Sequence, residues 1–571
     1  MKTMGKTTPF KKTISVEGSM PIENDAHRYA IRNAFDHKGK ADIGALVGKL
    51  KALYPDANPK ELVPIAKQAV ERVNNMGMDE IHGEYDQYQK EGFELKIPEK
   101  KVGLMDLDWA THEPMVTRFA PNPSAPSHLG HLRPAILSYL YAKKYDGKFI
   151  LRFDDTDPKL KKPMEGSEQI YLDDLRWLGI IPDVVARTSD RMDIYYDYMQ
   201  QIVEMGHAYV CTCETEKWKA LIHKKEACPC RELGVEEQKI RFHKMLTHEY
   251  KQGECVLRIK TDLNLDDPSQ IDWPLARIVD NPIHYRVKEK YLWPVYNFAS
   301  AIDDHLMNIT LIFRGQEHYQ NMLKQKWLYQ HFGWVYPHAF HHGRLLIKGT
   351  ELSKSRILLG IQTGKYSGFD DPRLYTVEAM RRKGFSPQAL IDFIIDLGVK
   401  PSDTVVDVEL LGIFNKKYLE NAPLFPFIQD PISLEADFVP AMDINMDGKI
   451  ISLKAGTQSF FVGKKEAEKW KVGTILRLRN VYIVKVNRVD EYRVNAQFVS
   501  TAKLEKTTQT NWLTEGVDVR ITMPDGQDVY GIAGTDTATL KVDDEILFSN
   551  FGYCRVDKIV DKEIRLWFTH Q

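Results

Sequence analysis

Two histidines are the residues whose types and spacing could do chemistry on a phosphate group. His128 and His131 flank Gly130 in the stretch SHLGH, just before an apolar helical run. The backbone N–H groups at a helix start favour anions, and imidazoles three residues apart can share one face. Gly130 would let a ligand approach the backbone closely. The stretch predicts a nucleoside triphosphate site; the alternative is two ordinary surface histidines, since short patterns recur by accident.

A strand, a loop and a helix must position these histidines. The sequence predicts a strand from Val116 to Ala120, a turn rich in proline and serine, and a helix from Pro134 to about Tyr145. Pro134 suits a first helical turn, where its missing N–H is no loss. We therefore expect the histidines at or just before the helix N-terminus.

A second strand, expected from Lys148 to Phe153, ends in a group of carboxylates. Acids at the carboxyl end of a parallel strand face the ligand crevice of a doubly wound sheet, so Asp154 is placed to meet a cation. Asp155 and Asp157 are better explained as turn and cap residues, because aspartate before threonine or proline commonly starts a turn or a helix.

The composition is that of a soluble globular protein. The chain has 571 residues, 43% of them hydrophobic and 27% charged, which indicates roughly three to five domains. A formal net charge of −1 gives no global attraction for nucleic acid, so any RNA contact must come from local basic patches. The start of the chain lacks an apolar signal core, and no stretch approaches the ~18 apolar residues of a membrane span. We expect a cytoplasmic protein with no membrane partner.

The cysteines favour a metal over disulfides. The chain has 6 cysteines, and four of them form two Cys-x-Cys pairs in one region, Cys211 with Cys213 and Cys228 with Cys230. Such pairs could supply four thiolates to a tetrahedral zinc, which would be structural because no coordination position stays open for a substrate. The alternative is a set of reduced, buried cysteines.

Two stretches together resemble a known signature. RFAPNPSAPSHLGH followed by LRFDDTDP is similar to the first motif region of class I glutamyl- and glutaminyl-tRNA synthetases. The later stretch ELSKS matches the core of the K-M-S-K-S motif of class I synthetases, with Glu351 and Leu352 in place of the first lysine and the methionine. The resemblance implies that His128, His131 and Lys354 are catalytic. The compact ammonium of Lys354 suits the charge that develops on departing pyrophosphate.

The same resemblance implies a pocket for the amino acid and one for ATP. Asp154 would hold the α-ammonium group, Arg118 would contact the carboxylate region, and Arg314 would meet the side-chain carboxylate. Without the resemblance, Arg314 would be explained as a strand-end salt bridge. Tyr296 and Ser300 would line the amino-acid pocket. The expected ATP-binding residues are Ala120, Asn122, His128, Gly130, His131, Glu317, Arg344, Leu345, Ser353 and Lys354.

The C-terminal part changes its periodicity. From about Leu424 apolar residues alternate with polar ones, which predicts strands, and strands with frequent turns imply β-barrels. In this family, β-barrel anticodon domains occur in glutaminyl and in archaeal or eukaryotic glutamyl enzymes. Basic and aromatic residues there could stack on unpaired nucleotides, with surface charge on a strand as the equal alternative. They are Arg477, Arg479, Tyr482, Lys485 and Arg488.

The predicted fold class is multidomain α/β plus β, with a Rossmann-type catalytic domain. The expected divisions are a helical N-terminal appendage (1–105), the first half of the catalytic domain (106–210), an inserted acceptor-end domain with the zinc site (211–287), the second half with the LSKS loop (288–365), a helical bundle (366–423) and β-barrel anticodon-binding domains (424–571).

The resemblance implies a glutamate–tRNA ligase of the archaeal type. Its substrates would be ATP with Mg²⁺, L-glutamate and glutamate tRNA, and one structural zinc is the further expected metal. The alternatives are a glutaminyl-tRNA synthetase and a non-catalytic tRNA-binding paralogue. The sequence leaves open whether glutamine tRNA is also charged with glutamate, and whether the protein is a monomer or a homodimer.

Overall fold

The protein divides into two compact units, Met1–Lys101 and Val102–Gln571. The computed structural model describes residues 21–37, 39–54, 57, 59–90, 103–348, 354–446, 449–502 and 507–571. Within these ranges, no helix combines the length and the apolar character that crossing a membrane requires.

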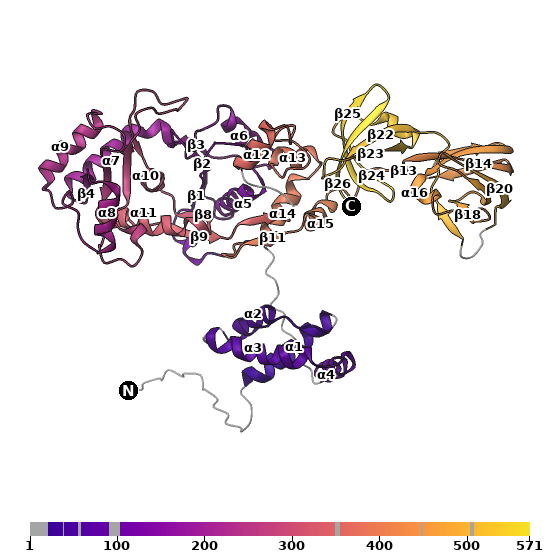
Figure 1. The fold of residues 1–571 in the computed structure, drawn as a ribbon, viewed down its shortest axis with the longest axis horizontal. Coiled ribbons are helices and arrows are strands. Elements are labelled where there is room, and N and C mark those ends of the chain that lie inside the picture. The colour runs from indigo at the N-terminus through magenta and orange to yellow at the C-terminus, as the bar shows by residue number, and fades with distance from the viewer. Residues whose placement is uncertain are drawn as a thin grey trace, which may run out of the picture. The chain divides into compact units, whose positions relative to one another are not determined.

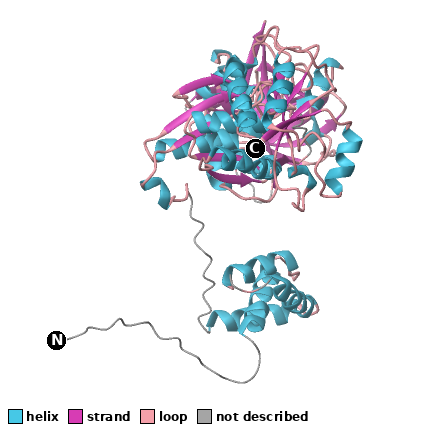
Figure 2. Ribbon diagram, turned by 90° about the vertical axis from the view of Figure 1, so that its left-hand side faces the viewer, coloured by secondary structure: helices cyan, strands magenta, loops and turns pink. Residues whose placement is uncertain are grey.

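The first unit is helical, as Figure 2 shows. Each helix turns apolar side chains inward, so that Ala30, Leu50, Ala66 and Ile81 are 0% exposed. Asp42 caps one helix by accepting a hydrogen bond from the N–H of Ala45 at 2.7 Å. The helices are α1 (Pro21–Asp36), α2 (Ile43–Leu53), α3 (Pro59–Asn74) and α4 (Met78–Lys90).

A parallel five-stranded sheet with the order β3-β2-β1-β8-β9 organises the second unit (Figure 1). Its strands are β1 (Val116–Phe119), β2 (Lys148–Phe153), β3 (Val184–Arg187), β8 (Leu311–Gly315) and β9 (His338–His342). Strand β1 pairs with β2 on one side and with β8 on the other. The strand order reverses between β1 and β8, which is where doubly wound sheets bind ligands.

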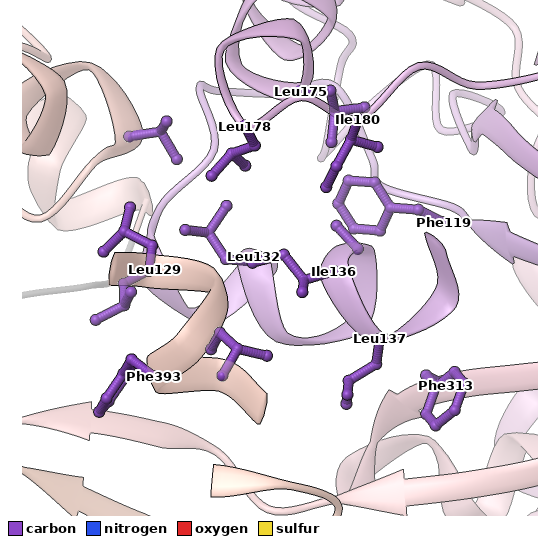
Figure 3. Close-up of a cluster of buried hydrophobic side chains, with 14 of the residues drawn as sticks. Phe119, Leu129, Leu132, Ile136, Leu137, Leu175, Leu178, Ile180, Phe313 and Phe393 are labelled. Carbon is purple, nitrogen blue, oxygen red and sulfur yellow. The ribbon is translucent and has the colours of Figure 1, made fainter. Parts of the chain in front are cut away.

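Helix α5 (Leu129–Lys144) covers this sheet and begins before the predicted start, so Pro134 lies inside the helix. The prediction was wrong because His128, which is not among the usual capping residues, caps the helix. The apolar contacts of the helix explain why it continues through the proline, and Figure 3 shows them. Leu132 and Ile136 face the cluster formed by Leu175, Leu178, Ile180 and Phe119. Leu137 lies near Phe313, and Leu129 lies near Phe393. Burial of this apolar stripe outweighs one missing backbone hydrogen bond.

Further helices and short 3₁₀ turns come before, between and after the strands of this sheet in the chain. In order they are α6 (Ser167–Trp177), α7 (Met192–Glu204), α10 (Tyr296–Leu306) and α11 (Tyr319–Phe332), with 3₁₀ turns η1 (Asp108–Thr111), η2 (Thr188–Arg191) and η4 (Gln316–His318).

A separate antiparallel sheet with the order β4-β5-β6-β7 lies between the two halves of the parallel sheet in the sequence. Its buried strand face packs on α7 and α9 through Val210, Leu257, Met199 and Phe242. The elements are β4 (Ala208–Cys211), α8 (Thr215–His223), α9 (Val235–Leu246), β5 (Val256–Ile259), η3 (Pro268–Gln270), β6 (Pro274–Ile278) and β7 (Leu292–Pro294).

A short helical region connects the parallel sheet to the β-rich region. It contains α12 (Lys354–Gln362), α13 (Val377–Arg382), α14 (Pro387–Leu397) and α15 (Val408–Lys416), together with the strand pair β10 (Leu345–Ile347) and β11 (Thr404–Val406). Arg382, at the end of α13, forms a two-point ion pair with Asp557 at 2.8 and 2.9 Å and lies over the ring of Trp567. This contact fixes the connecting region to the C-terminal strands.

From Leu424 onward the described residues form mainly strands, as the alternating periodicity predicts. A seven-stranded sheet has the order β12-β24-β25-β26-β22-β23-β13, and a six-stranded sheet has the order β17-β14-β20-β19-β18-β21. Strands β15 and β16 form a hairpin. The bounds are β12 (Leu424–Phe425), β13 (Phe427–Gln429), β14 (Pro431–Val439), β15 (Met442–Met446), β16 (Lys449–Leu453), β17 (Gly456–Gly463), α16 (Lys464–Ala467), β18 (Ile475–Leu478), β19 (Ile483–Val489), β20 (Arg493–Ser500), β21 (Thr508–Thr510), β22 (Val517–Thr522), β23 (Asp528–Ala533), η5 (Thr535–Thr539), β24 (Glu545–Phe548), β25 (Gly552–Val560) and β26 (Glu563–His570).

Candidate functional site

The start of helix α5 fixes both histidines and their tautomers. His128 is the N-cap residue and its Nδ1 accepts from the N–H of Gly130 at 3.1 Å, while Nδ1 of His131 accepts from the N–H of His128 at 3.3 Å. A neutral imidazole that accepts at Nδ1 carries its proton on Nε2. The two rings lie 3.9 Å apart between centroids. The backbone therefore makes both histidines Nε2–H donors, which suits a phosphate ligand.

Gly130 has a local reason to be glycine. A Cβ atom at this position would lie 3.0 Å from Cε1 and 3.1 Å from Nδ1 of His128. The absence of a side chain thus gives the capping imidazole its room. The segment that contains His128 and Leu129 is held by a second part of the chain. His128 forms a β-bridge with Thr376, and the N–H of Leu129 donates to the carbonyl of Tyr375 at 3.0 Å.

A buried ion network lies at the carboxyl ends of β1 and β2. Arg118 donates to both carboxylate oxygens of Asp304 at 3.0 and 3.1 Å. Arg152 donates to Asp304 and to Asp154, each at 2.8 Å, and to the hydroxyl of Ser300 at 3.1 Å. All of these residues are less than a tenth exposed. The two guanidinium groups hold the pKa of Asp304 below its usual value despite the burial, so Asp304 is their permanent counter-ion.

Asp154 differs from Asp304 because only one of its oxygens is used. Its Oδ1 accepts from Arg152, whereas the buried Oδ2 has no hydrogen-bond partner among the described residues. Burial raises the pKa of Asp154 to about 6 against the opposing effect of Arg152. An unpaired buried carboxylate oxygen is costly, and an ammonium group of a ligand would satisfy it.

The sequence favours turn and cap roles for Asp155 and Asp157. The structure gives such a role to Asp157 but not to Asp155. Asp157 accepts from the N–H groups of Lys159 and Leu160 at 2.9 Å, which is a local turn cap. Asp155 is 0% exposed and instead joins distant segments, since it accepts from Thr188 at 2.8 Å and from Ser189 at 2.6 Å. The sequence spacing could not reveal this long-range contact.

Arg314, at the end of β8, is a buried cation without an acidic partner. It is 5% exposed, and its three nitrogens donate to Gln325 at 3.0 Å, Tyr336 at 2.7 Å and His341 at 3.2 Å. Within the described part of the chain, no carboxylate pairs with it. The salt bridge that would explain a strand-end arginine is thus absent there, whereas Arg118 in the same sheet has its aspartate.

The histidines beside Arg314 are held neutral. Burial, together with the nearby positive charge of Arg314, lowers the pKa of His318 and of His341 to about 4. Burial also lowers the pKa of His342. The ring of Tyr296 lies 5.6 Å from that of His318 between centroids, at the start of α10. The described side chains that hydrogen-bond Arg314 directly are neutral, namely Gln325, Tyr336 and His341.

The remaining predicted ATP residues differ in exposure and in how far the structure describes them. Asn122, after β1 and Ala120, donates to the carbonyl of Asp154 at 3.0 Å, which ties the two strand ends together. Glu317 is exposed after β8, and Arg344 is exposed and lies 3.5 Å from Asp403. Leu345 is buried in the core cluster. Ser353 lies outside the described residues, and of Lys354 only the backbone, which begins α12, is described.

The four predicted cysteines lie together beside β4. The Sγ–Sγ distance is 3.9 Å for Cys211 and Cys228 and 3.7 Å for Cys213 and Cys230. Tetrahedral zinc with Zn–S bonds of about 2.3 Å separates its sulfurs by about 3.8 Å. A hydrogen bond from Cys211 lowers the pKa of Cys228 to about 5, so one thiolate is already favoured. The sulfurs of Cys211, Cys213 and Cys228 lie within 4.8 Å of one another, and that of Cys230 lies 3.7 Å from Cys213, so the donor set is compatible with a structural zinc.

One residue proposed for nucleotide stacking is excluded. Tyr482 is 0% exposed and its hydroxyl donates to the carbonyl of Pro440 at 2.5 Å, so its ring belongs to the core of the six-stranded sheet. Register irregularities in the pairing of β19 with β20 occur at Ile483/Val484, immediately after it. The four consecutive residues from Val481 to Val484 are all buried, so simple alternation does not hold at Tyr482.

Sequence reasoning missed several residues that complete the site. Asp304 and Arg152 are the charged partners of Arg118 and Asp154, and Gln325 and Tyr336 hold Arg314. The only available signal was the unusual Asp303–Asp304 pair inside an otherwise apolar helix. Gln325, at 0% exposure on α11, carries no recognisable motif.

Known proteins resemble this chain over most of its length. The family described as "tRNA synthetases class I (E and Q), catalytic domain" matches residues 114–421. A protein of Thermococcus onnurineus named "Glutamate--tRNA ligase" is 42% identical over 97% of this chain and 100% of its own length. The protein of the same name from Pyrococcus abyssi is also 42% identical, with the same coverage. A crystal structure of a glutamate tRNA ligase from Elizabethkingia meningosepticum aligns at 24% identity with a TM-score of 0.40, over 54% of this chain and 70% of that one.

Proposed function

The chain belongs to the class I tRNA synthetases of the glutamate and glutamine group, and from this premise we propose that it is a glutamate–tRNA ligase. It activates L-glutamate with ATP and transfers the glutamyl group to the 3′ end of glutamate tRNA. The curated relatives at 42% identity carry this name. The observation in the site that supports the choice of glutamate is Arg314, a buried guanidinium that pairs with no carboxylate of the described residues.

The first step forms glutamyl-adenylate. An oxygen of the glutamate α-carboxylate attacks the α-phosphorus of ATP, the bond to the bridging oxygen breaks, and pyrophosphate leaves with that electron pair. His128 and His131 donate their Nε2 protons as hydrogen bonds to phosphate oxygens, at a helix start that itself favours anions. Lys354, at the first turn of α12, supplies a positive charge for the leaving pyrophosphate. Mg²⁺ bound to ATP supplies further neutralisation of the phosphate charge.

The amino acid is held by its charged ends. Oδ2 of Asp154 accepts from the α-ammonium group, and Arg314 meets the side-chain carboxylate with charge-assisted hydrogen bonds. Tyr296 and Ser300 line the space between, and Arg118 is held in place by Asp304. In the second step a hydroxyl of the terminal ribose attacks the activated carbonyl carbon, and AMP leaves. The chemistry needs no covalent enzyme intermediate.

The other parts of the chain have proposed roles that follow from the family. The region 211–287 grips the acceptor end and carries one structural zinc on Cys211, Cys213, Cys228 and Cys230. The helices of 366–423 connect the catalytic halves, 106–210 and 288–365, to β-barrel domains in 424–571 that bind the anticodon. The helical region 1–105 is an accessory unit. The enzyme acts in the cytoplasm.

The decisive experiment is ATP–pyrophosphate exchange with glutamate and with glutamine, each with and without tRNA. We expect exchange with glutamate, and we expect Arg314→Ala to raise the KM for glutamate far more than the KM for ATP. The physical reason is that a glutamate carboxylate that has lost its water needs the guanidinium. Wild-type protein that activates glutamine as well as glutamate would favour the glutaminyl alternative, and protein that activates neither would favour the non-catalytic one.

A further inference from the structure

A contrast among three buried arginines suggests how the enzyme selects an acidic substrate. Arg118 and Arg152 both pair with aspartates that are themselves buried. Arg314 is equally buried, yet the acceptor that lies 3.0 Å from its Nη1 is the side-chain oxygen of Gln325. Glutamine has nearly the shape of glutamate but carries no charge. An acid at this one position would neutralise Arg314 from within the protein.

We propose that Gln325 is a specificity-determining positioning residue: its neutral amide holds Arg314 in place while leaving the guanidinium uncompensated for the substrate's side-chain carboxylate. This rests on the proposed use of glutamate and adds the reason why that site takes an acid. The side-chain carboxylate of the substrate then forms an ion pair with Arg314, for which the protein supplies only the guanidinium.

The hydrogen bonds around Arg314 form a closed ring that orients the guanidinium. Nη1 donates to Oε1 of Gln325, Nη2 donates to the hydroxyl of Tyr336 at 2.7 Å, and that hydroxyl donates to the same Oε1 at 2.8 Å. The two donors fix the amide orientation, because only its oxygen can accept both. Nε is used by His341. One N–H remains on each terminal nitrogen, so donors are left for a substrate carboxylate.

The amide nitrogen of Gln325 supplies a second observation. Nε2 is buried and has no hydrogen-bond partner among the described residues, although the side chain is 0% exposed. An orphaned buried donor is costly, typically about 1–3 kcal/mol. It belongs to the same amide that holds Arg314, so an acceptor of the substrate within its reach would satisfy it. The guanidinium without a carboxylate calls for an anion, and the orphaned amide N–H calls for an acceptor.

The surrounding charges agree with this assignment. His318, His341 and His342 are kept neutral by burial, so they neither add to nor cancel the charge of Arg314. Bound glutamate brings one compensating charge to this end of the pocket. Bound glutamine would leave the guanidinium buried and unpaired. This state is costly, because removing one partner of a buried ion pair leaves an uncompensated charge.

The test is Gln325→Glu, which adds a charge without changing the size of the side chain. We expect the glutamate KM to rise by about a hundredfold and the glutamate preference over glutamine to fall by a similar factor, since a protein carboxylate now occupies the guanidinium. The KM for ATP should stay within about twofold. The matched control is Gln320→Glu, the same change at an exposed position of α11, which should leave all these constants unchanged.

A variant that folds normally and keeps the wild-type preference for glutamate overturns the proposal. If Gln325→Glu does not fold, Gln325→Met decides, because it removes the acceptor and adds no charge. Loss of orientation should then raise the glutamate KM at least fivefold with the ATP KM unchanged, and an unchanged glutamate KM overturns the proposal. Failure of the proposed function has a different result, since wild-type protein would then not activate glutamate at all.

Discussion

Asp154 gives one carboxylate oxygen to Arg152, at 2.8 Å from its Nε, and keeps the other buried and unpaired among the described residues. The neighbouring Asp304 uses both of its oxygens on arginines. Two acids of one network are thus in different states, one saturated and one with an open acceptor. The open oxygen is the group that we assign to the α-ammonium of the substrate.

The first prediction concerns this oxygen. Asp154→Asn removes the charge while keeping the shape, so we expect the glutamate KM to rise by about ten- to a hundredfold with little change in the ATP KM. Steady-state aminoacylation with each substrate varied in turn measures both. Asp157→Asn is the matched control, because that residue caps a turn and makes only a long contact, 4.0 Å, with Arg277. Equal effects of the two changes would remove Asp154 from the amino-acid site.

The second prediction concerns the helix start. His131→Ala should slow adenylate formation by about ten- to a thousandfold, the effect of removing one preorganised donor at a developing charge, with tRNA affinity nearly unchanged. His131 also accepts a hydrogen bond from the N–H of His128, so His131→Asn, which can still accept there, serves as a control for the cap. Stopped-flow rates equal to wild type in His131→Ala would exclude a role in the chemistry.

The third prediction concerns the metal. Protein purified without chelators should contain about one zinc per chain by elemental analysis, bound by the four thiolates. Cys228→Ser should lower that content and the melting temperature, because the metal joins β4 to the loop before α9. Cys255→Ser changes a buried cysteine outside the quartet and should keep the zinc. A metal-free preparation of full activity and stability would contradict the assignment.

The fourth prediction concerns pH. Lys383 is 1% exposed, and burial lowers its pKa from 10.5 to about 7. Between pH 7 and 10.5 the unfolded chain keeps this proton and the folded one does not, so this group makes stability rise with pH across that window. The free energy of unfolding of wild type minus that of Lys383→Met should increase by up to about 1.4 kcal/mol per pH unit there.

Urea unfolding at several pH values from 7 to 10 measures this difference. Lys400→Met, at an exposed position after α14, provides the comparison and should give a flat difference. Parallel stability profiles for wild type and Lys383→Met would mean that the ammonium of Lys383 keeps its proton in the folded protein.

Local patterns made some features of this molecule predictable. The strand–loop–helix stretch around SHLGH has a recognisable order of elements, and β2 has the bounds that its apolar run predicts. The start of α5 was wrong because the cap is a histidine, and the sequence rules for helix starts rest on serine, threonine, aspartate and asparagine. The clustering of the four cysteines was predictable. The sequence already places them in two close pairs, so only one contact between the pairs had to be assumed.

The partners of Arg314 show what sequence could not supply. Gln325 comes from α11, Tyr336 from the following loop and His341 from β9, so three elements meet at one guanidinium. Their sequence spacing follows no helix or strand period that points at Arg314. Only the parallel pairing of β8 with β9 and the packing of α11 bring them together.

The central place of β1 in the sheet has a consequence for synthesis on the ribosome. Val116, the first residue of β1, binds the side chain of Thr310, which lies 194 residues further along the chain. At roughly 5–20 residues per second, translation takes about 10–40 s to cover that distance. During this interval β1 can pair with β2 but keeps its other edge open, while β4 to β7 emerge and can pair among themselves. Asp304 emerges only at the end of the interval. Arg118 therefore forms its ion pair with Asp304 only after β4 to β7 have been synthesised.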